Sequence, residues 1–169
     1  GGIQYHDFKE PKKLVIHPEI LNKLPSSEAE KIKSDFTIIK TKVPREIAQG
    51  VYYLGEIPRK NNFEAGTYEK EKMRDDSAIA IKTKKGVVVI SGCSHAGICN
   101  ICEYAKKITG QKLYTVIGGF HLFQEDQKAI DETLKYFKTE KPKHLYPMHC
   151  IDFPTLTQFY LTFGIQKLS

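Results

Sequence analysis

Apolar residues recur with a regular period mainly in the second half of the chain. Ser77 to Thr83 and Val87 to Ile90 are apolar stretches on either side of Lys84-Lys85-Gly86, which predicts two strands joined by a turn. Further along, apolar residues at helical spacing alternate with short apolar runs. This pattern predicts a helix over Gly97 to Ile108 closed by Gly110, a strand over Leu113 to Ile117, a helix over Gln124 to Phe137, a strand over His144 to Tyr146 and a helix over Pro154 to Phe163.

The first half of the chain carries a weaker pattern. Its predicted elements are a strand over Lys13 to Ile16, a helix starting at Pro18, a helical stretch over Ser26 to Lys33, and short strands over Phe36 to Lys40 and Gly50 to Leu54. From Glu56 to Arg74 the periodicity disappears and charged residues dominate. We expect a long loop there, and long loops inside compact domains are often functional.

The alternation of strand and helix in the second half predicts right-handed crossover units. Such units make Val87 to Ile90, Leu113 to Ile117 and His144 to Tyr146 parallel to one another. The carboxyl ends of the three strands should then lie along one edge of a sheet.

A histidine follows each of these three strands. His95 stands in SGCSH, His121 in GGFH and His149 in PMHC. A single histidine at a strand end is more often a hydrogen-bonded structural residue than a ligand. Three at equivalent places favour a metal site, because open α/β sheets bind ligands at this edge and imidazole suits zinc, iron and manganese.

The four cysteines allow several interpretations. Cys93 can add a thiolate ligand or pack as a small apolar residue, and Cys150 beside His149 has the same two interpretations. Cys99 and Cys102 have C-x2-C spacing but lie in a predicted helix without a second such pair, which favours core packing. A chain of this length without a secretory signal is expected to keep its thiols reduced.

Two further features point to substrate contacts. Asp75 and Asp76 precede the strand that starts at Ser77, where they either orient a ligand or contact substrate, or are solvated turn carboxylates. The first amides of the next helix, from Ala96 to Ile98, can bind a phosphate or carboxylate, which makes Asp76 and Gly97 substrate-binding candidates.

Composition narrows the class of protein. With 169 residues, 40% of them hydrophobic and 27% charged, the chain fits one domain over residues 1 to 169. It has no apolar run of about 20 residues and no signal-peptide stretch in GGIQYHDFKE, so we expect a cytoplasmic protein that does not enter membranes. The net charge of +6 comes from lysines scattered along the chain, which makes a nucleic-acid partner unlikely.

The two ends of the sequence suggest a piece of something longer. Gly1-Gly2 opens the chain without a methionine, and Ile165 to Ser169 looks like the start of a final strand. We therefore expect that the chain lacks a preceding part.

DDSAIAI, GVVVISGCSHAGICNI, VIGGFHL and YPMHC together resemble the C-terminal half of metallo-β-lactamase-fold proteins, in the subfamily related to the archaeal dihydropterin synthase of methanopterin biosynthesis. The resemblance spans about residues 13 to 163. It implies an α/β fold, an αββα sandwich of which this chain is an incomplete C-terminal portion. It also implies one or two divalent metal ions, usually zinc or iron, and largely hydrolytic chemistry.

The resemblance also carries site residues. By this resemblance, His95 matches the family's third histidine position and His149 the last, while His121 falls near the position of an acidic bridging ligand, for which Cys93 is a weaker candidate. The main motif, H-x-H-x-D-H, does not occur in these 169 residues. The catalytic residues themselves stay unknown at this stage.

Two hypotheses follow. In the first, the chain is part of a metal-dependent hydrolase or transferase that acts on a small, anionic substrate. In the second, it is a non-catalytic fragment or a subunit that needs a partner to complete the metal site. In both, a missing half would leave one face of the sheet uncovered, which favours self-association or a partner chain.

Overall fold

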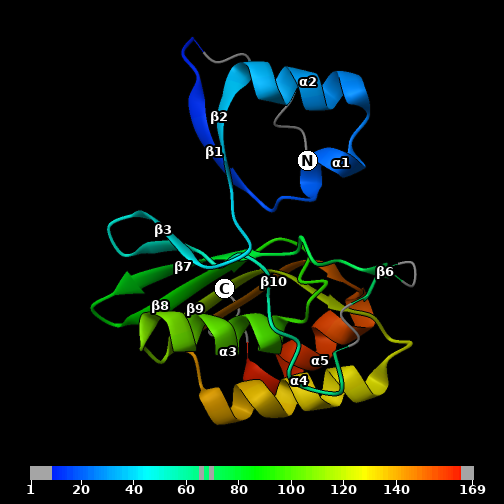
Figure 1. Ribbon diagram of the computed structural model, residues 1–169. Coiled ribbons are helices and arrows are strands. Elements are labelled where there is room, and N and C mark those ends of the chain that lie inside the picture. Colours follow the sequence, from blue (N-terminus) through cyan, green and yellow to red (C-terminus); the bar gives the residue numbers. More distant parts are fainter. Residues whose placement is uncertain (1–8, 65–66, 69–70, 165–169) are drawn as a thin grey trace.

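The computed structural model describes residues 9–64, 67–68 and 71–164 (Figure 1). Its centre is a six-stranded sheet with the order β10-β9-β8-β7-β4-β3. The strands are β3 (Arg45–Ala48), β4 (Val51–Tyr53), β7 (Ala78–Thr83), β8 (Gly86–Ser91), β9 (Leu113–Leu122) and β10 (His144–Ile151). Gly1-Gly2 and the strand predicted from Ile165 lie outside the described residues.

The predicted parallel strands are confirmed. β9 pairs in parallel with β8 on one side and with β10 on the other, and the aligned residues include Ile90 with Ile117 and Ile117 with Tyr146. β7 and β8 form the predicted hairpin, in which Gly86 adopts a φ of +134°. The carboxyl ends of β8, β9 and β10 therefore meet at one edge of the sheet.

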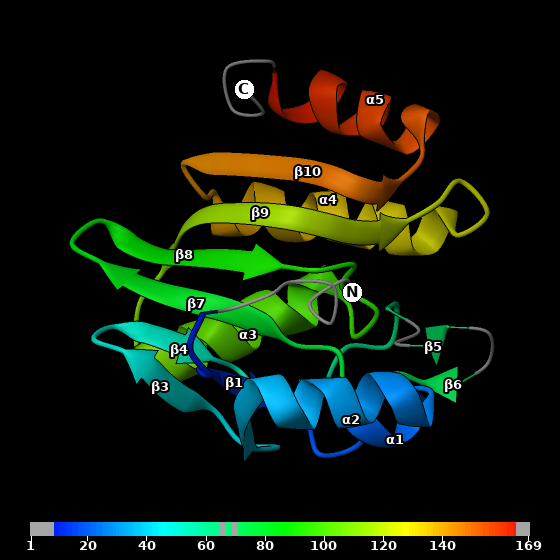
Figure 2. The ribbon, with the colours of Figure 1, turned by 90° about the horizontal axis from the view of Figure 1, so that it is seen from above.

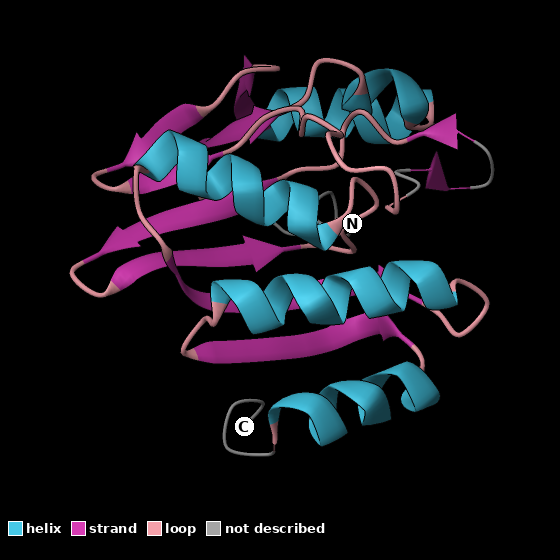
Figure 3. Cartoon of the chain, turned by 90° about the horizontal axis from the view of Figure 1, so that it is seen from below, coloured by secondary structure: helices cyan, strands magenta, loops and turns pink. Residues whose placement is uncertain are grey.

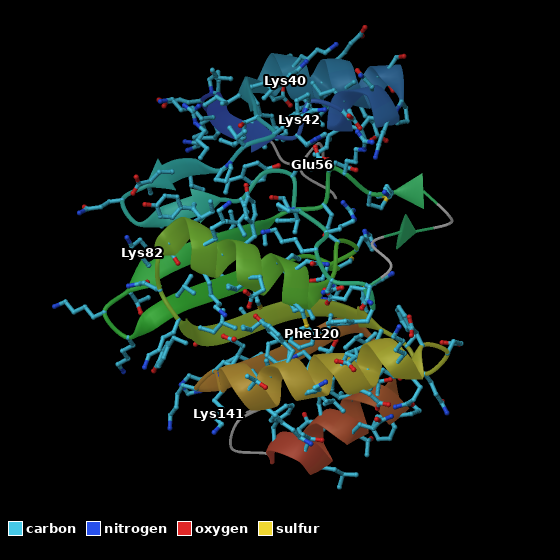
Figure 4. The ribbon with its side chains drawn as sticks, turned by 60° about the horizontal axis from the view of Figure 1, so that its bottom comes forward. Lys40, Lys42, Glu56, Lys82, Phe120 and Lys141 are labelled. Carbon is cyan, nitrogen blue, oxygen red and sulfur yellow. The ribbon has the colours of Figure 1, made fainter. Side chains whose placement is uncertain are left out.

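Three helices cover one face of this sheet: α3 (Ile98–Thr109), α4 (Gln127–Glu140) and α5 (Phe153–Phe163) (Figure 3). Alternate strand residues such as Val89, Val116 and Leu145 point to these helices and are fully buried. A cluster of Phe120, Phe137 and Phe159 joins β9, α4 and α5, with ring centroids 5.7 Å apart in both contacts made by Phe120. Figure 4 shows Phe120 between the sheet and α4.

The opposite face of the sheet is more open. Seen from above, no described helix lies over β8, β9 or β10 (Figure 2). Ile90 on β8 keeps 42% of its surface exposed, and Ile117 and Tyr146 in the neighbouring strands are only partly buried. An apolar sheet face therefore stays accessible to water in this part of the chain.

The N-terminal residues form a small unit with a core of its own. It comprises β1 (Lys12–Ile16), α1 (Ile20–Lys23), α2 (Ser26–Asp35) and β2 (Phe36–Lys40), with β1 and β2 parallel. Its buried residues are Ile16, Leu21, Ile32 and Phe36. The predicted helix at Pro18 begins later, at Ile20, and an ion pair of 2.6 Å between Lys23 and Asp75 links the unit to the rest of the molecule.

The predicted long loop contains the short antiparallel strands β5 (Thr67–Tyr68) and β6 (Glu71–Lys72). The sequence pattern also missed β3, because all four of its residues are exposed and carry no hydrophobic alternation. Among the described residues, no helix has the length and apolar character needed to cross a membrane.

Candidate metal centre

The three predicted histidines lie at the same edge of the sheet. His95 is in the turn after β8, whereas His121 and His149 lie inside the last residues of β9 and β10. Both strands run further than the sequence pattern predicted, because β10 continues to pair with β9 through His149 opposite Gly119. The pairing holds the two histidines at the rim of the sheet, although His121 itself has a left-handed backbone with a φ of 49°.

His95 and His121 form a close pair. Their ring centroids are 4.7 Å apart and the rings are nearly perpendicular. Burial, followed by the charge of His95, lowers the pKa of His121, so its imidazole stays neutral over a wider pH range. The Nδ1 atom of His121 is buried and has no hydrogen-bond partner among the described residues. This ring nitrogen could therefore bind a metal ion.

His149 belongs to a different group. One ligand atom each from Cys93, His149 and Cys150 lie within 4.8 Å of one another. Over the described ranges, this is the one set of three or more histidine, cysteine or acidic residues that comes so close together. The three histidines therefore do not form a single compact cluster. Among the described residues, the close contacts are those of His95 with His121 and of His149 with Cys93 and Cys150.

Two glycines in β9 make this arrangement possible. A Cβ atom on Gly119 would lie 2.7 Å from the carbonyl oxygen of Gly92, 2.8 Å from Nε2 of His149 and 2.9 Å from the Cα of Cys93. A Cβ atom on Gly118, whose φ is +136°, would lie even closer to the carbonyl oxygen and the hydroxyl of Ser91. Because β9 has no side chains at these two positions, the segments that follow β8 and end β10 can approach each other across it.

Polar contacts hold the turn after β8 against Gly119. The amide of Gly119 donates to the carbonyl oxygen of Gly92 over 2.7 Å, and the Ser94 hydroxyl donates to the carbonyl oxygen of Gly119 over 2.5 Å. Ser94, His121 and Cys150 all have φ between 49° and 64°. Non-glycine residues adopt this region rarely and at a cost of about 1 to 3 kcal/mol, and such residues cluster at functional sites.

The start of α3 is capped by carboxylates of the chain itself. Asp76 accepts a hydrogen bond of 2.8 Å from the amide of Ala96, and Glu64 accepts from the amides of Cys99 and Asn100 over 2.8 and 3.0 Å. The amide of Gly97 donates to Ser94. The helix start that we expected to bind a substrate anion thus already holds two carboxylates, and a substrate contact of Asp76 or Gly97 stays a prediction.

Burial raises the pKa of both capping carboxyls. For Glu64 the amides of Cys99 and Asn100 and the side chain of Asn61 lower it in part, and for Asp76 the amide of Ala96 does so. Asp75, in contrast, pairs with Lys23 and faces the N-terminal unit.

Glu64 was not found from the sequence. It lies in the charged loop, 35 residues before its partner Cys99. The side chain of Asn61 donates to Glu64 over 2.5 Å, and Asn100 accepts from the amides of Lys60 and Asn61. The spacing of Asn61 and Glu64 is typical of a local turn, but nothing in the sequence pairs this turn with α3.

A cavity of about 220 Å³ opens beside the histidine pair. His95, His121, Glu64, Gly97, Phe120 and Phe123 are among its lining residues. Cys99 and Cys102, by comparison, lie in the core with 2% and 0% exposure, which confirms the predicted core packing, and burial raises their pKa values well above the usual range.

The crystal structure of Tm1679, a metal-dependent hydrolase of the β-lactamase superfamily, matches this fold with a TM-score of 0.78 at 22% identity. The match covers 96% of this chain and 68% of that one. In sequence, the chain is 35% identical over 153 residues to 7,8-dihydropterin-6-methyl-4-(beta-D-ribofuranosyl)-aminobenzene-5'-phosphate synthase of Methanocaldococcus jannaschii. The chain therefore has a metallo-β-lactamase-like fold.

These alignments cover most of this chain but only about half of each curated relative. The synthase alignment covers 82% of this metallo-β-lactamase-fold chain and 51% of the synthase. An uncharacterized protein of the same organism, MJ0448, is 31% identical over 134 residues, which covers 75% of this chain and 49% of that protein. No protein-family model matches. The chain thus spans about half the length of the curated relatives that it matches.

The donor atoms at the sheet edge fit the divalent metal expected of a metallo-β-lactamase fold. Neutral imidazole nitrogens and thiolates are the ligands that zinc prefers, and imidazole also suits iron. Because the Nδ1 atoms of both His121 and His144 are buried without a partner among the described residues, it is the pairing of His121 with His95 beside the cavity that favours such an ion. The assignment of His95, His121 and His149 as ligands stays a prediction.

Proposed function

We propose that this chain is the C-terminal part of a metal-dependent hydrolase or transferase that acts on a small, anionic substrate. In this proposal His95, His121 and His149 supply ligands for one or two divalent ions, zinc or iron, and Cys93 is a further ligand candidate. The observation that carries the proposal is the His95–His121 pair, whose ring centroids are 4.7 Å apart beside a cavity of about 220 Å³.

A metal ion bound there would polarise a substrate oxygen and lower the pKa of a water molecule. The chain's own residues prepare the site. The lowered pKa of His121 keeps its ring nitrogens available at neutral pH. The hydrogen bond from the amide of Ala96 to Asp76 fixes the turn that carries His95, so that this ring keeps its position beside His121.

A basic cleft separate from the histidine cavity offers a contact for the anionic group of a substrate. Arg59, Lys72 and Arg74 line a cleft of about 460 Å³ in the segment that precedes β7, together with Glu56. The lysines elsewhere are scattered: Figure 4 shows Lys40, Lys82 and Lys141 in widely separated parts of the molecule. The name of the related synthase describes a product with a phosphate group. A phosphate-bearing substrate fits both observations.

The alternative function is that of a fragment or subunit that needs a partner. Two observations favour it: the 169 residues contain no H-x-H-x-D-H motif, and the chain spans about half of its curated relatives. In this case the histidines would hold a metal weakly until further ligands are supplied. The open sheet face around Ile90 would contact the part that supplies them, either a second copy or a partner chain.

The test compares this chain with one extended upstream to include an H-x-H-x-D-H segment. Both are assayed on a generic phosphodiester and a lactone, and their metal content is measured. We expect little turnover and weakly held metal in the shorter chain, and an increase of both in the longer one. Equal turnover and equal metal content in the two chains would show that the active site lies elsewhere.

A matched pair of histidine variants tests the site itself. His121→Ala should lower the metal content of both chains, because it removes the half-buried imidazole at the cavity. His144→Ala is the control, since His144 starts β10 at the opposite end of the strand and stacks on Tyr146. Equal metal loss in both variants would contradict the proposed ligands.

A further inference from the structure

A further cavity lies between the loop before β5 and the helices α3 and α4, which stand side by side on one face of the sheet (Figure 3). Its volume is about 430 Å³, against about 220 Å³ for the cavity at the histidines, and the two cavities have no lining residue in common. Pockets for small molecules usually measure about 300 to 1,000 Å³ and combine apolar walls with a few polar groups. This cavity therefore has the size of a ligand site of its own.

Three aromatic side chains form its walls: Phe63 from the loop, Tyr104 from α3 and Tyr136 from α4. Each is partly buried and packs against the main hydrophobic core. Tyr136 has a ring contact with Phe137, at 5.2 Å between centroids, but no two of the three described wall rings are stacked on each other. A planar aromatic ligand suits such walls, because aromatic ring pairs attract each other beyond the area that they bury.

Hydrogen bonds within the chain hold the loop wall in place. Oδ1 of the buried Asn100 accepts from the amides of Lys60 and Asn61 over 2.9 and 3.2 Å, and its Nδ2 donates to the carbonyl oxygen of Ala96 over 2.9 Å. The side chain of Asn61 also donates to Glu64 over 2.5 Å. The cavity is thus preformed, and binding there loses little free energy to ordering of the loop.

The charged groups at the cavity favour a negative ligand. Glu103 is already satisfied, because its carboxylate accepts from Lys106 over 2.8 Å and from the hydroxyl of Tyr136 over 2.7 Å. Lys60 and Lys107 are the exposed lysines of the lining, and neither forms an ion pair with another described residue. Their ammonium groups can therefore pair with an anion. A singly charged carboxylate fits better than a phosphate, since Glu103 lines the same cavity.

We propose that this cavity binds a small planar aromatic acid, with its ring between Phe63, Tyr104 and Tyr136 and its carboxylate at Lys60 and Lys107. The proposal goes beyond the proposed function, because the cavity shares no lining residue with the one at the histidines. It holds whether or not the chain is an enzyme.

The test uses the absence of tryptophan from the chain. The fluorescence of an indole ligand can be excited at wavelengths where tyrosine does not absorb. Indole-3-acetate, indole-3-acetamide and tryptamine carry the same ring with a negative, a neutral and a positive group. Titrations of the 169-residue chain, followed by fluorescence anisotropy of the indole, should give the tightest binding for indole-3-acetate and the weakest for tryptamine.

Matched variants test the charge and the walls. Lys107→Glu should weaken binding of indole-3-acetate about threefold or more and leave that of indole-3-acetamide unchanged. Lys40→Glu makes the same change of charge in the N-terminal unit, away from the cavity (Figure 4), and should change neither. Tyr104→Leu should weaken binding of all three probes about threefold to tenfold, because it removes a wall ring. Tyr160→Leu, on α5 and outside the cavity, is its control.

Two other variants show whether the probe binds elsewhere. Ile90→Glu changes the open sheet face, and His121→Ala changes the cavity of the proposed function. Both should bind indole-3-acetate as the unmodified chain does, so loss of metal in His121→Ala with intact indole binding separates the two proposals. Loss of indole binding in either variant would place the probe at that other surface and overturn the proposal. Circular dichroism of each variant checks that it is folded.

A second measurement does not depend on variants. In nuclear magnetic resonance spectra of the unmodified chain, indole-3-acetate should shift the amide signals of Lys60, Tyr104 and Tyr136 and leave those of His95 and His121 unchanged. Shifts centred on the two histidines would overturn the site. No saturable binding of indole-3-acetate, equal affinity for the three probes, or equal effects of Lys107→Glu and Lys40→Glu would each overturn it as well.

Discussion

At the scale of single residues, the candidate site depends on the absence of side chains as much as on their presence. Gly118 and Gly119 let the turn after β8 lie against β9, and Ser94 closes the contact with a hydrogen bond to the carbonyl oxygen of Gly119. His121 and Cys150 occupy backbone conformations that most residues avoid. The positions of the ligand candidates are therefore set by close backbone approach.

Gly119→Ala should separate the two halves of the site. The added methyl group would lie 2.8 Å from Nε2 of His149 and 2.7 Å from the carbonyl oxygen of Gly92, and overpacking of this kind costs about 1 to 3 kcal/mol. We expect a lower urea midpoint and a lower content of bound divalent metal. Gly92→Ala is the control, since a Cβ atom there meets nothing within 4 Å. Equal effects of the two variants would contradict this explanation.

Glu64 should make stability depend on pH. Burial raises its pKa above 4.5, so the native state holds the proton more tightly than the unfolded chain does. The stability that this provides is fully present below pH 4.5 and is lost as the pH rises through the folded pKa. In Glu64→Gln, which cannot titrate, this component is absent.

We therefore expect the free energy of unfolding of the unmodified chain, minus that of Glu64→Gln, to fall as the pH rises from 4.5 through the raised folded pKa. Urea titrations at several pH values measure this difference. A difference that stays constant or grows with pH would contradict the raised pKa.

At the scale of elements, the helices that cover the sheet are anchored by their ends and by one aromatic cluster. Asp126 caps α4 by accepting from the amide of Ala129, and Asp152 caps α5 by accepting from the amide of Thr155. Asp152 also accepts from the amide of Gln124 over 2.7 Å, which ties α5 to the loop after β9. The caps thus connect the helices to the edge of the sheet that carries the site.

Asp152→Ala should destabilise the chain more than Asp152→Asn, because asparagine keeps an acceptor for the amide of Thr155. The hydrogen bonds with Thr155 and Gln124 lower the pKa of Asp152 below 3.8. Its contribution is therefore present above pH 3.8 and is lost as the pH falls through the folded pKa. Denaturation midpoints of the unmodified chain and of both variants, at neutral and acidic pH, measure this contribution. If the midpoint of Asp152→Ala stayed equally far below that of the unmodified chain in strong acid, the contribution would not come from the ionised carboxylate.

Phe159→Ala should cost about 3 to 5 kcal/mol of unfolding free energy, because it empties a fully buried position between α5 and β9. Phe153→Ala in the same helix is the matched control. Phe153 is 80% exposed, so its removal should change stability by less than about 0.5 kcal/mol. Comparable losses in the two variants, measured by urea unfolding, would show that α5 is not packed as described.

At the scale of the whole molecule, the sheet is covered on one face and open on the other. α3, α4 and α5 lie on the covered face, and the N-terminal unit stands over the opposite side nearer to β3 and β4 (Figures 1 and 2). Ile90 is exposed by 42%, and Ile117 and Tyr146, which are aligned with it on the neighbouring strands, are only partly buried. Contiguous apolar surface of this kind favours association with another protein surface.

We expect the 169-residue chain to self-associate through this face, and Ile90→Glu to shift it toward the monomer. Sedimentation over a range of concentrations measures the change. Val43→Glu is the control, because Val43 is 66% exposed but lies outside the sheet. A monomer at every concentration, or an equal shift in both variants, would show that this face does not drive association.

Much of the fold follows from local periodicity. The spacing of apolar residues predicts β7 to β10 and the helices between them, and the crossover rule makes β8, β9 and β10 parallel, which places His95, His121 and His149 at one edge. These properties depend on short-range backbone sterics and on the handedness of the connections, both of which act along neighbouring residues. β3 was not predicted because all four of its residues are exposed, and exposed residues need not alternate between apolar and polar.

The division of the candidate ligands into two groups is a property of the tertiary structure alone. Whether His149 lies beside His121 or beside Cys93 depends on strand register, on the bulge in β10 near His149, and on the space that Gly119 leaves. Likewise, Glu64 accepts a hydrogen bond from the amide of Cys99, 35 residues further along, only because the loop packs against the start of α3. Contacts between distant segments have no periodic signature, because they arise from the simultaneous fit of several elements.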